Sequence, residues 1–192
     1  KTKNILNLSN CLKNVDFIVL SPGISLKKTK NKKKLIKYKK KIITDIDLLF
    51  LTNKKFKSIV VTGSNGKSTT CKIITHLLEK NKFNVKLGGN IGTPVLNLRI
   101  EKNIFFVIEA SSFQLSHSKF IRPDYSILLN ITNDHIDWHG TMRKYIESKL
   151  KIFKHYIYDT EPTKLTAQIE KITNYKIRKQ NLLDEIKRVE KS

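Results

Sequence analysis

The segment that most constrains the fold runs from residue 58 to residue 78, where a short apolar run, a glycine-containing loop and an amphipathic stretch follow one another. Ile59-Val60-Val61 predicts a buried strand. The amphipathic stretch carries four apolar residues at helical spacing, which we expect on one helix face: Ile73, Ile74, Leu77 and Leu78. A strand, a tight loop and a helix in this order are the repeating unit of α/β proteins.

Similar units follow along the chain. Apolar runs at 85–87, 104–108 and 125–131 each end in a polar cluster. Short apolar strands that alternate with helical segments predict an α/β fold, a mainly parallel sheet with helices on both faces. Ligand-binding groups then belong at the carboxyl ends of the strands, where such sheets open a crevice.

Composition and hydrophobic pattern divide the chain into three parts. Residues 15–20 predict a strand that ends in the turn Ser21-Pro22-Gly23, a lysine-rich helix or helix-loop follows at 27–41, and a helix is expected at 45–51. Residues 53–57 are interpreted as a linker. We therefore expect an N-terminal domain at 1–52, a central domain at 53–158 and a tail of two amphipathic helices at 159–192, which pack on the chain's own core or on a partner.

Charge and cysteine content limit the function classes. The net charge is +22, and ten lysines fall between Lys27 and Lys41, with no arginine in that run and Tyr38 as its one aromatic residue, too few to stack on successive bases. This favours a solvated lysine-rich face over a specific nucleic-acid surface. Two cysteines exclude a disulfide framework and, with no apolar run long enough to cross a bilayer, indicate a cytoplasmic protein without a membrane partner.

The loop after the first strand of the central domain has the chemistry of a phosphate site. Backbone N–H groups of Gly63-Ser64-Asn65-Gly66 and the following helix N-terminus can surround a polyphosphate, Lys67 adds a positive charge, and Ser68 can bind Mg²⁺. The loop is two residues shorter than the usual phosphate-binding loop. The alternative is a glycine-rich turn that binds nothing.

Two further strand ends carry metal-type ligands. Glu109 ends the run at 104–108, and its carboxylate can hold a Mg²⁺ ion that neutralises phosphates. The alternative role is that of a helix-capping partner, because Ser111 and Ser112 follow. His135, between Asp134 and Asp137, is either a ligand or part of a polar turn.

Several motifs together resemble the Mur ligase and folylpolyglutamate synthetase superfamily, and within it the D-glutamate-adding ligases. The loop from Thr62 to Thr69 matches the short nucleotide loop of the superfamily. The other matching segments, in chain order, are Ser21-Pro22-Gly23, Gly88-Gly89-Asn90-Ile91-Gly92, Glu109-Ala110-Ser111-Ser112-Phe113-Gln114-Leu115, Asn130-Ile131-Thr132-Asn133-Asp134-His135-Ile136-Asp137 and His139-Gly140-Thr141-Met142.

The resemblance implies ATP and two Mg²⁺ ions as cofactors. It places Gly63 to Thr69 on ATP, Ser68 and Glu109 on one metal ion, and His135 on the second. It also implies substrate-binding roles, which fall on Ser21, Pro22, Gly23, Asn90, Ser111 and Gln114. Lys67, His135 and Lys149 are then catalytic.

Lys149 matches a lysine that this family carbamylates. A carbamate changes the amine from a cation into an anion, which can complete a metal site beside His135. Lys151 is the alternative, because it occupies a neighbouring register of the same amphipathic segment.

The implied reaction joins D-glutamate to UDP-N-acetylmuramoyl-L-alanine in peptidoglycan synthesis, by a monomeric ATP-dependent ligase that acts through an acyl phosphate. Trp138 departs from the family, which usually has a basic residue there. Beside the family, residues 1–52 are expected to be a remnant of a Rossmann-like UDP-substrate-binding domain, and the chain is expected to lack the rest of the ATPase sheet and the C-terminal domain that binds D-glutamate. Two alternatives stay open. One is another Mur ligase or a folylpolyglutamate synthetase relative, and the other is a fragment that binds nucleotide or polyanion without catalysis.

Overall fold

A four-stranded parallel sheet forms the centre of the protein, in a computed structural model that describes residues 12–24, 26, 29–52 and 56–154. The strand order is β4-β5-β3-β6. The strands are β3 (Phe56–Thr62), β4 (Val85–Gly89), β5 (Ile104–Glu109) and β6 (Tyr125–Leu128). The predicted α/β fold is confirmed. All elements described below belong to one compact unit, Lys1–Phe153.

Alternate residues of the strands pack into two separate cores. Val60 and Phe106 belong to the larger hydrophobic cluster, whereas Ile59, Val61 and Val107 belong to the cluster on the opposite face. Successive side chains of a strand point to opposite faces, so near-continuous apolar strands require cover on both sides.

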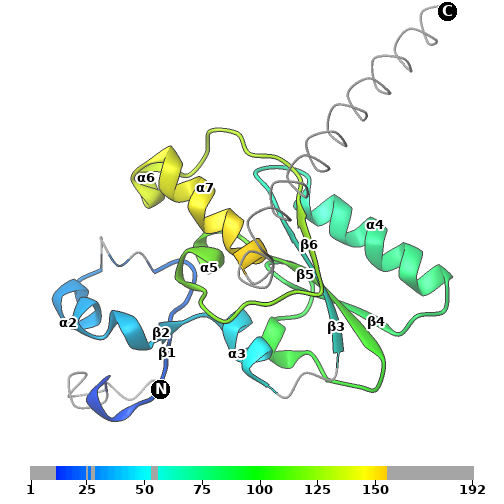
Figure 1. The fold of residues 1–192 in the computed structure, drawn as a ribbon, viewed down its shortest axis with the longest axis horizontal. Coiled ribbons are helices and arrows are strands. Elements are labelled where there is room, and N and C mark those ends of the chain that lie inside the picture. Colours follow the sequence, from blue (N-terminus) through cyan, green and yellow to red (C-terminus); the bar gives the residue numbers. More distant parts are fainter. Residues whose placement is uncertain (1–11, 25, 27–28, 53–55, 155–192) are drawn as a thin grey trace, which may run out of the picture. The chain divides into compact units, whose positions relative to one another are not determined.

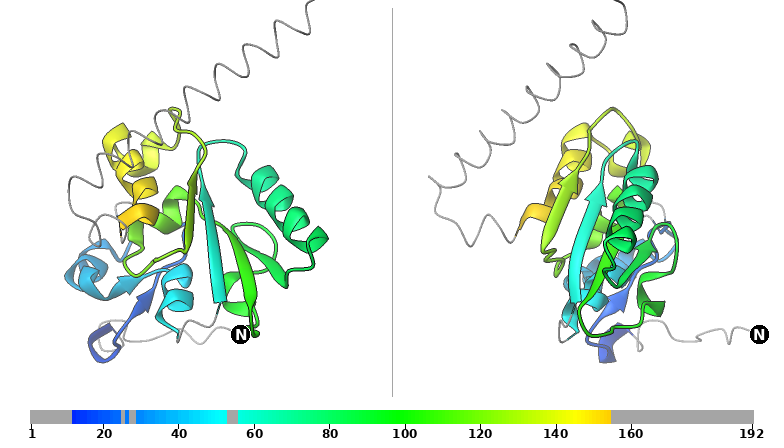
Figure 2. Two further views of the ribbon diagram at one scale, coloured as in Figure 1. Left: turned by 45° about the vertical axis from the view of Figure 1, so that its right-hand side comes forward. Right: turned by 90° about the vertical axis from the view of Figure 1, so that its right-hand side faces the viewer.

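Helices supply that cover (Figures 1 and 2). On one face lies α4 (Lys67–Lys80). On the other lie α3 (Asp45–Leu51), α5 (Ser112–His117), α7 (Met142–Leu150) and the short 3-10 helices η2 (Val95–Asn97) and η3 (Lys151–Phe153). The single-turn helix α6 (Ile136–His139) precedes α7.

The four apolar residues of α4 do not share one face as predicted. Ile74 and Leu78 pack against the core beside buried Cys71, but Ile73 and Leu77 are 54% and 55% exposed. Adjacent residues of a helix differ by about 100° in direction, so two neighbouring rows cannot both face a narrow core. Cys71, three residues before Ile74, lies on the buried row.

Three element boundaries differ from the sequence prediction. The expected linker at 53–57 is too long, because Phe56 and Lys57 already pair with β5. The strand expected at 125–131 ends at Leu128, after which the chain turns across the glycine loop. The strand expected at 15–20 is reduced to β1 (Ile18–Val19), which pairs in parallel with β2 (Ile42–Ile43).

The lysine-rich stretch forms the six-residue helix α2 (Lys32–Lys37) and the 3-10 helix η1 (Lys39–Lys41). Leu35 is the buried residue of α2, and it packs with Leu12, Leu20 and Ile42. All the lysines of α2 are exposed. The domain boundary at 52/53 stays a prediction, and the predicted helices at 159–192 lie outside the described residues.

Asp47 connects helix α3 to the loop between α5 and β6. This fully buried carboxylate accepts hydrogen bonds from Ser118 Oγ (2.6 Å), Phe120 N (2.8 Å) and Lys119 N (2.9 Å). It also completes the capping box of α3 with Thr44. A buried charge is tolerated only with such a full set of donors. The loop between α5 and β6 is thereby held against α3.

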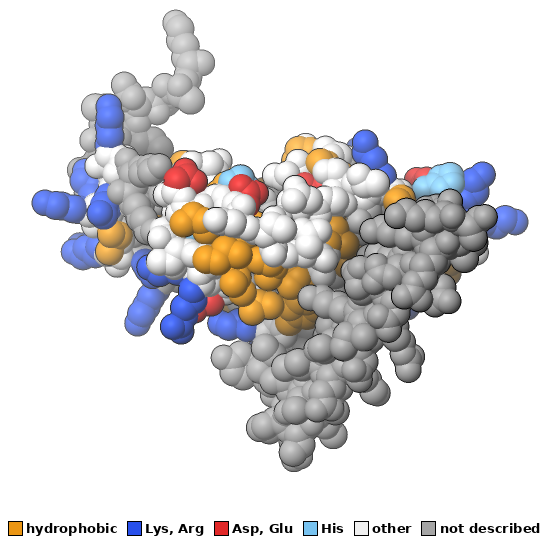
Figure 3. Space-filling model, turned by 90° about the horizontal axis from the view of Figure 1, so that it is seen from above, with side chains coloured by type: hydrophobic (Ala, Val, Ile, Leu, Met, Phe, Trp, Pro, Cys, Tyr) orange, Lys and Arg blue, Asp and Glu red, His pale blue; other side chains and the backbone are white. Residues whose placement is uncertain are grey.

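No helix in the described part of the chain is long and apolar enough to cross a membrane. The face seen in Figure 3 carries lysine and arginine side chains mainly toward its ends, with hydrophobic side chains between them. On that face the positive charge is therefore divided rather than gathered into one continuous patch.

Candidate functional site

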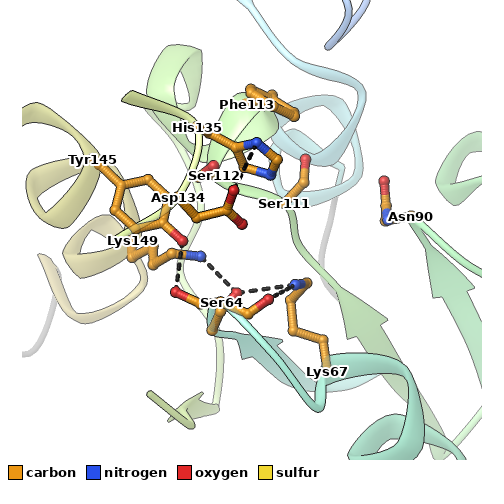
Figure 4. Close-up of a pocket in the computed structure, with 11 residues that line it drawn as sticks. Ser64, Lys67, Asn90, Ser111, Ser112, Phe113, Asp134, His135, Tyr145 and Lys149 are labelled. Carbon is orange, nitrogen blue, oxygen red and sulfur yellow. Dashed lines mark hydrogen bonds and ion pairs between the residues drawn. The ribbon is translucent and has the colours of Figure 1, made fainter. Parts of the chain in front are cut away.

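The predicted ligand groups meet at the carboxyl edge of the sheet. The glycine loop follows β3, Asn90 follows β4, Glu109 ends β5, and the segment 129–135 follows β6. A cavity of about 120 Å³ opens at this edge (Figure 4), and Glu109 is not among the residues that line it. Seven of the sequence-predicted site residues line it: Gly63, Ser64, Lys67, Asn90, Ser111, His135 and Lys149.

The glycine loop presents a free helix N-terminus. Gly66 is the N-cap of α4 with φ +81°, a left-handed conformation that favours glycine, and no side chain caps the helix. The first backbone N–H groups of a 14-residue helix are thus left for a ligand. Such N-termini attract phosphate groups.

Asn130 fixes the loop from the side of β6. Its Oδ1 accepts from the backbone N–H groups of Ser64 (3.1 Å) and Asn65 (3.0 Å), and its Nδ2 donates to Asn65 O (3.1 Å). The backbone carbonyl of Asn130 also accepts from Ser64 N. The loop therefore has its shape before any ligand binds, which reduces the entropy cost of binding.

Lys67 folds back over the loop. Its Nζ donates to Ser64 O (2.8 Å) and Gly63 O (3.0 Å), and it lines the cavity. Figure 4 shows the amine on the cavity side of the loop. A phosphate at this position meets a point charge as well as backbone donors.

Glu109, at the end of β5, contacts the start of α4 and the residue that follows β4. This carboxylate is 1% exposed; it accepts from Ser68 Oγ at Oε2 (2.7 Å) and from Asn90 Nδ2 at Oε1 (2.9 Å). The alternative role as a capping partner is wrong, because Ser111 and Gln114 form the capping box of α5. Glu109 and Ser68 therefore stand together at the foot of the loop.

The Glu109–Ser68 pair fits Mg²⁺ bound with phosphate. Among the described residues no group of three or more His, Cys, Asp and Glu can enclose a metal ion. Magnesium, however, is commonly held by one or two carboxylates together with water and phosphate oxygens. One carboxylate and one hydroxyl 2.7 Å apart match that mode.

Gly89 allows Asn90 to reach Glu109. It has φ +106°, and a Cβ there would lie 2.3 Å from Glu109 O. The backbone N–H of Asn90 donates to that same carbonyl (2.9 Å). The close approach of β4 to β5 requires glycine at this position.

Lys149 is almost fully enclosed, with 1% exposure. Its Nζ donates to Gly63 O (2.7 Å) and lies 4.7 Å from the centre of the Tyr145 ring. Burial, together with the charge of Lys67, lowers the pKa of the amine from 10.5 to about 8, although Asp134 acts in the opposite direction. A buried lysine with a lowered pKa is a reactive amine.

Lys151, the alternative to Lys149, points elsewhere. Its Nζ donates to the backbone carbonyls of Ser116 and Ser118, and it lines a different cavity. Only Lys149 of the two lies at the glycine loop.

His135 stands at the rim of the first cavity. Its Nδ1 lies 3.2 Å from Asp134 Oδ1, and its side chain is 45% exposed. The residue has φ +52°, which turns the chain into α6, and its ring packs against Phe113 at 4.6 Å. The ring is thus held at the cavity while one side stays open to a ligand.

Some predicted residues serve other purposes. Gln114 is buried; it caps α5 through Ser111, and its amide nitrogen is 3.4 Å from Asp45 Oδ1. The turn at 21–23 does not line the cavity. A substrate-binding role for these residues stays a prediction.

Sequence reasoning missed Tyr145. Its hydroxyl lies 2.7 Å from Ser64 Oγ, and the residue is fully buried. Burial raises the pKa of this phenol and outweighs the bond from Ser64. The signal was present, because Tyr145 precedes Lys149 by four residues and therefore shares its helix face.

The structure shows an α/β domain with a glycine loop at the carboxyl edge of a parallel sheet, and the comparison with known families gives its class. Residues 61–185 match the Mur ligase middle domain, so the chain belongs to the Mur ligase family. The match includes part of the stretch 159–192, where the sequence shows no recognisable motif.

Relatives of known name come from several bacteria. A UDP-N-acetylmuramoylalanine--D-glutamate ligase of Rickettsia felis is 46% identical over 73% of this chain and 31% of its own length. The ligase of the same name from Francisella philomiragia is 40% identical over 80% of this chain and 39% of its own. The chain thus spans about a third of the length of these relatives.

A solved structure is also similar. The UDP-N-acetylmuramate:L-alanyl-gamma-D-glutamyl-meso-diaminopimelate ligase from Neisseria meningitides has 18% sequence identity and a TM-score of 0.47, and the match covers 76% of this chain and 51% of that one.

Proposed function

We propose that this chain supplies the ATP-binding part of a ligase that joins D-glutamate to UDP-N-acetylmuramoyl-L-alanine in the cytoplasm. The observation that carries the proposal is the meeting of Lys67, Glu109 and Lys149 around one glycine loop. The names of the relatives from Rickettsia and Francisella support the choice of substrates.

The loop binds and aligns the triphosphate. Backbone N–H groups at the start of α4 and the Lys67 amine hold the β- and γ-phosphates, while Asn130 keeps the loop in place. Ser68 and Glu109 would hold Mg²⁺, whose charge would neutralise the negative charge that develops on the phosphates. Asn90 fixes the orientation of Glu109.

The chemistry requires two aligned transfers. An oxygen of the alanyl carboxylate attacks the γ-phosphorus, and the bond to ADP breaks, which gives an acyl phosphate and ADP. The amine of D-glutamate then attacks the acyl carbon, phosphate leaves, and the amine loses a proton as the amide forms. Positioning and charge neutralisation are sufficient for both steps, so no side-chain nucleophile is needed.

Lys149 is proposed to carry a carbamate. A neutral amine adds to CO₂ to give the carbamate and one proton. At pH 8 about half of an amine with the lowered pKa is neutral, against well under one per cent for an ordinary lysine. The carbamate would face His135 across the cavity and supply, with it, the second Mg²⁺ site.

Phosphate release tests the substrate assignment. We expect release from ATP to require both UDP-N-acetylmuramoyl-L-alanine and D-glutamate. Replacement of D-glutamate by meso-diaminopimelate or L-glutamate should abolish it. Release that instead follows diaminopimelate or a folate acceptor would assign the chain to another branch of the superfamily.

A second candidate is ATP binding without turnover. Saturable binding of Mg-ATP together with no phosphate release under any substrate combination supports this candidate.

A further inference from the structure

A second cavity, of about 480 Å³, lies between α2 and the helices α5, α6 and α7. It shares no lining residue with the cavity at the glycine loop. Small-molecule sites typically enclose roughly 300 to 1,000 Å³. The space is therefore sufficient for a ligand of nucleotide size.

Lysines dominate its polar lining. Four different elements each contribute one: Lys32 from α2, Lys39 from η1, Lys144 from α7 and Lys151 from η3. The acidic residue of the lining, Glu147, lies 2.8 Å from Arg143. Positive charge is thus in excess, which favours an anionic ligand.

His117 is affected by this charge. Burial, followed by the charges of Lys151, Lys39 and Lys119, lowers the pKa of its imidazole to about 4. The ring is therefore neutral at pH 7 and offers one donor and one acceptor.

The rest of the wall is apolar or aromatic. Leu26 and Ile36 lie on the side of α2, and Trp138 lies opposite, with its ring 5.8 Å from that of His117. The ring nitrogens Trp138 Nε1 and His117 Nε2 are buried and have no hydrogen-bond partner in the described part of the chain. A buried polar group without a hydrogen-bond partner is destabilising, and a ligand atom within reach that makes this hydrogen bond would offset the cost.

We propose that this cavity binds an organic anion with an aromatic ring and a phosphate group, of which a nucleoside monophosphate is the simplest. The ring lies against Trp138, where an indole offers stacking area. The phosphate lies among Lys39, Lys144 and Lys151. A ring without a phosphate would leave the lysines without a ligand, and a phosphate without a ring would leave Trp138 without one.

One hydrogen bond connects the wall of this cavity to the wall of the first. His139 lines the second cavity, and its Nε2 lies 3.0 Å from Ser112 Oγ, which lines the first. The experiment must therefore distinguish the two cavities.

Trp138 is the chain's only tryptophan, so its fluorescence reports directly on this site. We expect adenosine 5′-monophosphate to change the fluorescence saturably in the wild type and equally in Lys67→Ala, which disables the glycine-loop site. The double variant Lys39→Glu/Lys144→Glu should bind at least about tenfold more weakly. Lys72→Glu/Lys80→Glu on α4, with the same change in net charge, should bind as the wild type does.

Adenosine and inorganic phosphate test the two halves of the proposal. Each should bind at least about tenfold more weakly than the monophosphate, because each lacks one set of contacts. No saturable change with the monophosphate overturns the proposal. So does a change that is lost in Lys67→Ala, one that weakens equally in both charge-reversal variants, or one that inorganic phosphate reproduces at the same concentration.

Discussion

The Lys149 amine donates a hydrogen bond of 2.7 Å to the carbonyl oxygen of Gly63, the first glycine of the glycine loop. A residue on α7 therefore contacts a loop that lies 86 positions earlier in the chain. The contact places the proposed carbamate beside the proposed triphosphate.

Isotope labelling tests the carbamate. With ¹³C-bicarbonate at pH 8, we expect a carbamate ¹³C signal in the wild type, because about half of the Lys149 amine is neutral there. Lys151→Met is the matched control and should keep the signal, whereas Lys149→Met should lose it. A signal that survives in Lys149→Met would contradict the assignment.

Stability against pH tests the burial of Lys149. The folded-state pKa is about 8 and the ordinary value is 10.5, so the unfolded chain binds more protons between these limits. The penalty for a buried charge is fully present below pH 8 and is relieved as the pH rises to 10.5. Relative to Lys149→Met, the wild type should gain on the order of 3 kcal/mol of unfolding free energy between pH 7 and 10.5.

Denaturant titrations of both proteins at several pH values measure this difference. The comparison with the variant cancels the titration of the exposed lysines. A difference that does not change with pH would mean that the amine is solvated.

Asp47 should be a main support of the N-terminal part. Asp47→Ala leaves the donors of Ser118, Lys119 and Phe120 without their acceptor, and we expect a loss of roughly 3 kcal/mol of unfolding free energy. Asp45→Ala is the matched control on the same helix. It removes only the long contacts to Gln114, at 3.4 and 3.5 Å, and should cost less than about 1 kcal/mol. Equal losses for the two variants would refute the special role of Asp47.

Gly89 should not tolerate a side chain. In Gly89→Ala the new Cβ meets Glu109 O at 2.3 Å at a left-handed φ, so β4 must shift and carry Asn90 away from Glu109. We expect a loss of roughly 2–4 kcal/mol of stability and weaker Mg-nucleotide binding. Gly23→Ala, where a Cβ meets nothing within 4 Å, should behave as the wild type in both thermal unfolding and binding.

The sequence predicted the parts of the site that depend on local pattern. The positions of the glycine loop after β3, of Asn90 after β4 and of Glu109 at the end of β5 follow from apolar runs that end in polar clusters, because parallel strands bring their carboxyl ends to one edge. The choice of Glu109 as ligand or cap required the structure, since Ser111 forms the cap with Gln114.

Contacts between distant segments could not be predicted in this way. The hydrogen bonds of Asn130 to the glycine loop and of Tyr145 to Ser64 depend on how β6 and α7 pack against the loop. A short sequence pattern contains no information on that packing. Helix α4 shows a related limit. Ile73 and Leu77 follow a helical spacing as regular as that of Ile74 and Leu78, but only the second pair faces the sheet.

Mg-ATP binding by calorimetry is the most direct test of the central claim, that the glycine loop is a nucleotide site built around Lys67. The wild type should bind one equivalent, and Lys67→Ala should bind roughly ten- to a hundredfold more weakly, because a charge-assisted contact to phosphate is lost. Lys72→Ala, on the exposed face of the same helix, should leave the affinity unchanged. Equal affinities of the wild type and Lys67→Ala would contradict the account.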